Sequence, residues 1–156
     1  MARKQSVRAV VIKERSVLVM KRNKFGRLYY TLVGGDIELG ETAEQALRRE
    51  LQEEAGLAVG TIRPVFMEDA GDMYGLQYIY LCEYQGGEPH IDPASIEASL
   101  NAVGQNTYET LWLPIDQLAQ VPFRSSSVRD ALLEAARNGF PETPVTLAWR
   151  PESMTK

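Results

Sequence analysis

The alternation of hydrophobic and polar residues predicts a mixture of strands and helices along the chain. Runs of β-branched and aromatic residues bounded by turn residues predict strands, which cover residues 7–12, 16–20, 29–32, 61–67, 76–84 and 107–113. Apolar residues at helical spacing occupy 43–55 and a final segment that Ser127 and Asp130 are expected to cap and Gly139 to end. This order of elements favours an α/β fold built as a sandwich.

Two of the strand patterns indicate where their strands lie in a sheet. The run 76–84 carries apolar residues on both faces, which is typical of a central strand covered on both sides. Near the C-terminal end, Val145, Leu147 and Trp149 alternate with other residues. They predict either an edge strand or a surface that docks on a partner. A second copy of the chain, in a homodimer, is one such partner.

The helix predicted at 43–55 has clear start and stop signals. Thr42 and Gln45 form a capping box, and Gly56 follows the last periodic residue as a stop. Because a helix advances about 100° per residue, each side chain of this segment can be placed on one face or the other.

Glutamates occupy the face of this helix that should be buried. Glu50 and Glu54 fall inside the apolar stripe, and Glu53 lies on its border. Ionised acids that face a protein interior need a partner, and a hard divalent cation such as Mg²⁺ is the usual one where phosphates share its coordination. The alternative is that neighbouring arginines satisfy the carboxylates; Arg49, one turn before Glu53, can pair with it.

Length, charge and cysteine content restrict the class of protein. A chain of 156 residues fits a single domain, and its net charge of −4 argues against a partner that is a nucleic-acid polymer or an anionic membrane. The single cysteine, Cys82, alternates with tyrosines as a buried hydrophobe, which fits a reducing cytoplasm. The apolar run Ala9 to Ile12 is too short for a leader or a membrane span.

A basic tract precedes the glycine-rich stretch in this otherwise acidic chain. It contains Lys21, Arg22, Lys24 and Arg27 within seven residues. Guanidinium and ammonium groups bind phosphates through charge-assisted hydrogen bonds. The tract therefore predicts contacts with substrate phosphates, the alternative being a solvated loop.

The residues from 35 to 57 resemble the Nudix box at every defined position. Gly35 is followed after five residues by Glu41, and after seven more by the run Arg49-Glu50-Leu51-Gln52-Glu53-Glu54-Ala55-Gly56-Leu57. Upstream, Val33 stands where many members of the family carry proline. The resemblance implies one Nudix domain over residues 1–156, with a mixed β-sheet between helices in an α/β/α sandwich.

The resemblance also implies a reaction and its residues. A Nudix hydrolase cleaves nucleoside diphosphates linked to another moiety, small-molecule substrates, by water attack that depends on Mg²⁺ or Mn²⁺. Glu50, Glu53 and Glu54 are then the expected metal ligands, with the Gly34 carbonyl a further one. Glu53 or Glu54 is also the expected base, and Arg49 completes the catalytic set.

In several relatives a glutamate from a later loop completes the metal shell or acts as base. Here Glu97 and Glu109 are the two candidates. Glu97 lies in the longest irregular stretch, 86–106, on a short helix that Asp92 and Pro93 are expected to start. A stretch of this length is typical of a binding loop or lid.

Two other functions fit the same fold. A Nudix-fold module can bind a nucleotide as a sensor without cleaving it, but such a module has no physical need for three convergent acids. An isomerase of isoprenoid diphosphates needs a catalytic thiol, whereas Cys82 is expected in the core. The hydrolase is therefore the favoured hypothesis.

Overall fold

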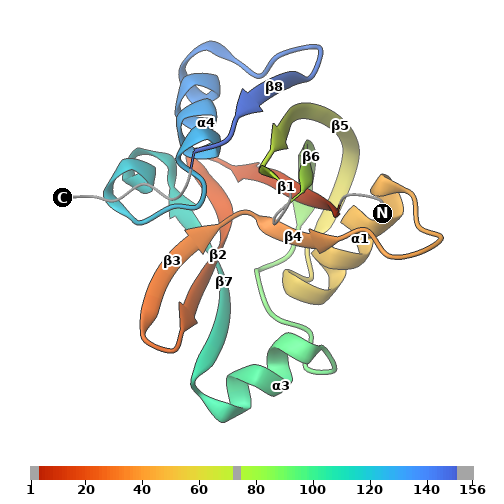
Figure 1. Cartoon of the computed structure of the whole chain (residues 1–156), viewed down its shortest axis with the longest axis vertical. Coiled ribbons are helices and arrows are strands. Elements are labelled where there is room, and N and C mark those ends of the chain that lie inside the picture. The colour runs from red at the N-terminus through yellow and green to blue at the C-terminus, as the bar shows by residue number, and fades with distance from the viewer. Residues whose placement is uncertain (1–3, 72–74, 151–156) are drawn as a thin grey trace.

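The protein is described by a computed structural model over residues 4–71 and 75–150. The strands are β1 (Gln5–Lys13), β2 (Ser16–Lys24), β3 (Arg27–Thr31), β4 (Val33–Asp36), β5 (Ala58–Asp69), β6 (Leu76–Gly86), β7 (Asn106–Pro114) and β8 (Val145–Ala148). The helices are α1 (Ala43–Glu54), α3 (Ile96–Val103) and α4 (Ser126–Asn138), with a 3₁₀ helix at Ile115–Gln120. Figure 1 shows α4 and β8 at the top and α3 at the bottom.

The strands form a mixed sheet, as predicted. The order is β3-β2-β1-β6-β5-β8, while β4 pairs with β1 and β7 pairs with β2. β1 runs parallel to β6 and β5 parallel to β8; the remaining pairs are antiparallel. The pairing of Arg8 with Gly34 and of Val7 with Gly35 places the glycine pair directly beside β1. β8 is an edge strand, which confirms that interpretation of the C-terminal alternation.

Alternate side chains of the central strands point to two separate cores. Val10 of β1 packs in the core that contains Leu132 of α4, whereas Ala9 packs in the core that contains Leu47 and Leu51 of α1. Because side chains alternate across a strand, one strand can supply both cores. α1 and α4 therefore cover opposite faces of the sheet (Figure 1), and the predicted α/β/α sandwich is confirmed.

The central position of β6 is also confirmed. β6 lies between β1 and β5, with Ile79 buried in the α4 core and Cys82 buried in the α1 core. Both of its faces are thus covered, as the two apolar faces of 76–84 predicted.

The boundaries of β2, α3 and α4 differ from the predictions for identifiable reasons. β2 continues through the basic tract to Lys24, because its residues pair with β3 on one side and β7 on the other. α3 begins after Ser95, whose hydroxyl accepts from the Ala98 amide, and not at Asp92. α4 begins after Ser125, not Ser127, since the Ser127 hydroxyl donates to Glu68 instead.

Candidate active site

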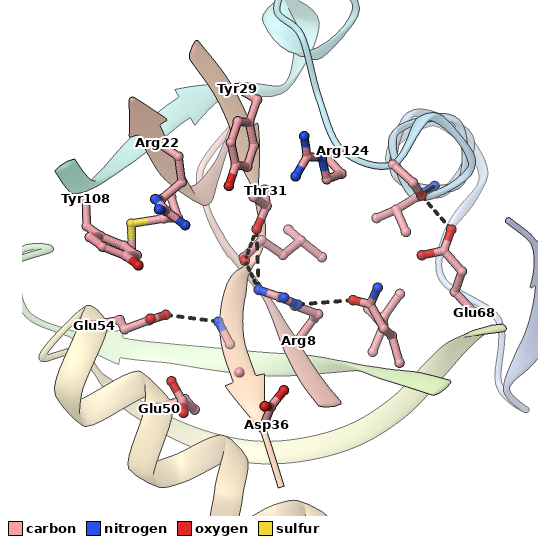
Figure 2. Close-up of a pocket in the computed structure, with 18 of the residues that line it drawn as sticks. Arg8, Arg22, Tyr29, Thr31, Asp36, Glu50, Glu54, Glu68, Tyr108 and Arg124 are labelled. Atoms are coloured by element: carbon pink, nitrogen blue, oxygen red, sulfur yellow. Dashed lines mark hydrogen bonds between the residues drawn. The ribbon is translucent and has the colours of Figure 1, made fainter. Parts of the chain in front are cut away.

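A cleft of about 590 Å³ opens between the part of the sheet that carries α1 and the part that carries Arg22. Acidic residues from β4, α1 and α3 line it, together with arginines from β1, β2, β3 and the segment before α4. Figure 2 shows Asp36, Glu50 and Glu54 in the lower part of the view, and Arg22 and Arg124 in the upper part. Its charged lining consists of Arg8, Arg22, Arg27, Arg124, Asp36, Glu38, Glu50, Glu54, Glu68 and Glu97. A cleft of this size accommodates a nucleotide-sized ligand.

Glu50 and Glu54 lie on the buried face of α1, as the periodicity predicted. Glu50 is 7% exposed and Glu54 is 6% exposed. The backbone N–H of Gly34 donates to Glu54 Oε1 at 3.1 Å, and the Thr110 hydroxyl donates to the Glu54 backbone carbonyl. Both carboxylates line the cleft, so they are buried in the protein and yet face its main cavity.

Burial raises the pKa of both acids. Desolvation, with the Glu50 charge as the next cause, raises the pKa of Glu54 to about 8. Desolvation also raises the pKa of Glu50, against the opposing effect of Arg49. Because each ionised form is costly here, a cation between them would be held strongly.

Arg49 organises the surrounding carboxylates. Its guanidinium donates to both oxygens of Glu41, at 2.7 and 3.0 Å. It also donates to Glu50 Oε1 at 2.7 Å, to Glu53 Oε1 at 3.1 Å and to the Asp36 carbonyl at 3.0 Å. The bond from Arg49 lowers the pKa of Glu41 to about 2. Arg49 thus fixes α1 to the preceding loop and holds Glu53 beside Glu50.

Gly35 permits the close approach of β4 to α1. A Cβ atom at this position would lie 2.6 Å from Glu50 Oε1, a distance that real Cβ contacts do not show. The glycine pair therefore brings the backbone of β4 against the carboxylates, where any larger residue would displace Glu50.

The donor set fits a hard divalent cation. Glu50 and Glu54 supply buried carboxylate oxygens at the cleft, of the kind that Mg²⁺ or Mn²⁺ accepts, and the Gly34 backbone lies against Glu54. In residues 4–71 and 75–150, no three acidic, histidine or cysteine side chains converge as a ready-made metal cluster. Glu53 is the outlying one: its carboxylate is 39% exposed and bonded to Arg49. Arg49 is an ion-pair partner of both Glu50, at 2.7 Å, and Glu53, at 3.1 Å.

The basic side of the cleft contains a partly buried hydrogen-bond network and arginines stacked on tyrosines. Arg8 donates to Gln77 Oε1 at 3.1 Å and to the Leu32 carbonyl at 3.1 Å. The Arg22 guanidinium lies over the rings of Tyr108, at 3.7 Å, and Tyr29, at 5.7 Å. The same guanidinium donates from Nε to the Thr107 carbonyl at 3.4 Å and from Nη2 to Asn106 Oδ1, so contacts with β7 fix it at the wall of the cleft.

The structure separates the predicted site residues into two groups. Arg22 and Arg27 line the cleft, whereas Lys21 and Lys24 do not. Strand alternation explains Lys21, which points away from the face of Arg22. Lys24 lies at the exposed end of β2.

The two candidates for a later acid are separated in the same way. Glu97 lines the cleft, and its charge contributes to the raised pKa of both Glu50 and Glu54. Glu109 is exposed on β7 and is absent from the lining, because Tyr108 and Thr110 on either side of it face inward.

Cleft residues that were not predicted from the sequence include Arg8, Arg124, Tyr108 and Glu68. Arg8 had a usable signal, since it is a lone charge inside the apolar run of β1. Glu68 and Arg124 had none, because they come together only through tertiary packing.

Two negative expectations can be compared with the structure. Cys82 is buried, and burial raises the pKa of its thiol to about 12, so it is the core residue that was expected. Within the described residues, no helix has the length and apolar character needed to cross a membrane.

Comparison with known proteins places this fold in a defined class. A family model of the NUDIX domain matches residues 2–134. The chain belongs to the Nudix hydrolase family.

Its curated relatives include NAD-capped RNA hydrolases named NudC. The protein from Pectobacterium carotovorum is 29% identical over 106 residues, which are 68% of this chain and 36% of the relative. That from Salmonella heidelberg is 30% identical over 110 residues, 70% of this chain and 38% of the relative. The chain thus spans little more than a third of the length of these relatives.

Solved structures share the fold at low sequence identity. An ADP-ribose pyrophosphatase from Streptococcus suis has a TM-score of 0.65 at 20% identity, covering 93% of this chain and 99% of that one. A MutT NUDIX hydrolase from Burkholderia pseudomallei has a TM-score of 0.65 at 22% identity, covering 86% and 98%.

Proposed function

We propose that the chain is a hydrolase of nucleoside diphosphates linked to another moiety, dependent on Mg²⁺ or Mn²⁺. The observation that carries the proposal is the pairing, across one cleft, of buried carboxylates with arginines. Carboxylates hold the cation, and guanidiniums hold phosphate oxygens. The names of the similar proteins, which refer to NAD-capped RNA and ADP-ribose, support a substrate with a pyrophosphate bond.

Each side chain has a separate task in this reaction. Glu50 and Glu54, with Glu53 and the Gly34 carbonyl, would hold the metal. When bound, the ion neutralises the diphosphate and lowers the pKa of its water. Arg22 and Arg27 orient the phosphates, while Arg49 keeps Glu53 beside Glu50.

Proton transfer falls to Glu53 or Glu54. Glu54 lines the cleft beside Glu50, and desolvation raises the pKa of its carboxyl to about 8. Glu53 is the more exposed of the two and lies within one turn of Glu50. Glu97, which lines the cleft, is the proposed later acid in preference to Glu109.

The test is a screen of diphosphate compounds with Mg²⁺, with products read by mass. The panel includes NAD, NAD-capped RNA, ADP-ribose, nucleotide sugars and nucleoside triphosphates. Glu53→Gln and Glu54→Gln retain the shape of each side chain but remove its charge. We expect turnover to fall by at least about a hundredfold in the variant that lacks the base.

The non-catalytic binding module is the second candidate. It predicts tight binding of one compound from the panel with no product formed by the wild type. That pair of results would replace the hydrolase proposal, since a sensor has no turnover for Glu53→Gln to remove.

A further inference from the structure

Glu68 is a buried carboxylate outside the box that the proposed reaction does not use. It is 1% exposed and lies on β5, between the paired strands β6 and β8. Its Oε2 atom accepts hydrogen bonds from the hydroxyls of Ser125 and Ser127. Burying a carboxylate is costly, so this arrangement calls for a reason beyond packing.

The serines that Glu68 binds belong to the segment that carries Arg124. Ser125 is the N-cap of α4, accepting from the Val128 amide at 3.3 Å. Glu68 thus lies where the first turn of α4 favours negative charge. The residue immediately before this cap is Arg124.

Arg124 is also fixed from its other side. Its backbone N–H donates to the Tyr30 carbonyl at 2.9 Å, and the Tyr30 N–H donates to the Pro122 carbonyl at 2.9 Å. Its guanidinium lies 3.9 Å from the centre of the Tyr29 ring. The Arg22 guanidinium lies 5.7 Å from the same ring centre. The backbone and the side chain of Arg124 are therefore both held in place.

Arg124 and Glu68 lie on the side of the cleft away from Glu50 and Glu54, the proposed metal ligands. Figure 2 shows them to the right, with Glu50 and Glu54 to the left and Arg8 between. A stacked guanidinium at this position can form two parallel hydrogen bonds to a phosphate.

We propose that Glu68 is a positioning residue, which holds Arg124 on the wall of the cleft as a binding group for a phosphate of the ligand. Ser125 and Ser127 transmit its effect, because both hydroxyls are anchored to one carboxylate oxygen. The inference rests on the proposed function in taking a nucleoside diphosphate compound as the ligand.

A double-mutant cycle tests this coupling without any turnover. The probe is α,β-methylene-ADP with Mg²⁺, whose diphosphate is not cleaved, and binding is measured by calorimetry. We expect Arg124→Gln, Glu68→Gln and Ser127→Ala each to weaken binding by about tenfold. In the Arg124→Gln background, Glu68→Gln should add less than about twofold, since the two act through one contact.

Ser126→Ala is the matched control. Ser126 is buried between the two serines, but its hydroxyl makes no bond to Glu68 among the contacts of the described chain. This variant should bind the probe as the wild type does. Ser127→Ala keeps the test valid if Glu68→Gln fails to fold.

Three outcomes would overturn the inference. One is equal loss of affinity from Glu68→Gln with and without Arg124. Another is a lower melting temperature in Glu68→Gln and Ser127→Ala with unchanged affinity, which would make Glu68 purely structural. The third is absence of probe binding by the wild type. If the wild type binds the probe but hydrolyses no compound of the panel, only the proposed function fails.

Discussion

At the scale of single residues, the sequence predicts a side chain's environment when one periodicity determines it. Glu50 and Glu54 were placed on the buried face of a helix, and the structure finds them there. Arg8 could have been found in the same way. Glu68 and Arg124 could not, because their contacts join β5 to the start of α4 and no local pattern encodes that meeting.

The ion pair between Glu41 and Arg49 predicts a pH dependence of stability. The pKa of the Glu41 carboxyl is lowered in the folded protein to about 2 from an ordinary value of 4.5. The folded state therefore binds fewer protons than the unfolded state in this range, and the carboxylate stabilises the fold above about pH 4.5. This contribution should disappear as the pH falls through about 2.

Glu41→Gln measures that contribution directly. Urea unfolding should find the variant less stable than the wild type at neutral pH, with the difference shrinking as the pH falls. Glu142→Gln, at an exposed position near the C-terminal strand, is the control. A difference that stays constant into acid would show that the Glu41 charge is not responsible.

Cys82 yields a prediction about reactivity. Burial raises the pKa of its thiol to about 12, so the thiolate is scarce at neutral pH and the sulfur is covered. A thiol reagent should therefore modify the folded protein only as fast as it unfolds, and rapidly in denaturant. Fast, stoichiometric modification of the native protein would contradict the buried environment.

At the scale of helices and strands, element type was predicted better than element boundary. The capping box of α1 is present as predicted. The starts of α3 and α4 each offered several serines or aspartates, and distant partners decided among them: the Asp92 N–H bonds the Glu53 carbonyl, and Ser127 bonds Glu68. Once the pairing of β2 was known, strand alternation determined which residues of the basic tract face the cleft.

That alternation predicts which members of the basic tract bind substrate. Arg22 and Arg27 line the cleft, and Lys21 and Lys24 do not. Replacing both arginines by glutamine should raise KM by at least about tenfold, since charge-assisted bonds to phosphate are lost. Replacing both lysines by glutamine removes the same charge and serves as the control. Equal effects of the two double variants on KM would show that only net charge matters.

At the scale of the whole molecule, the class of fold was predictable because each element had its own period and the box fixed the family. The pairing of β1 with both β4 and β6 was not predicted, since it joins segments that are far apart in the chain. The cleft arises at this level too, between the part of the sheet that carries α1 and the part that carries Arg22. Its acidic side concentrates charge that the folded chain must tolerate.

This concentration predicts that divalent metal stabilises the whole fold. Desolvation raises the pKa of both Glu50 and Glu54 in the folded state, and the Glu50 charge raises that of Glu54 further, so a cation that binds only this state offsets the cost of burying these charges. At a hundredfold excess over its Kd, such an ion adds about 2.7 kcal/mol to the free energy of unfolding. For a chain of this size, that corresponds to a rise in Tm of about 5–10 °C.

Thermal unfolding with and without Mg²⁺ measures this effect, and two variants of α1 locate it. Glu54→Gln removes a buried carboxylate of the cleft and should abolish most of the Mg²⁺-dependent rise. Glu44→Gln removes an exposed carboxylate from the same helix, one that pairs with Arg48 at 3.4 Å, and should retain the rise. Because both variants change the net charge equally, nonspecific screening by the salt would shift them alike. An equal rise in the wild type and in Glu54→Gln would place the metal elsewhere and remove the basis for assigning Glu54 as a ligand.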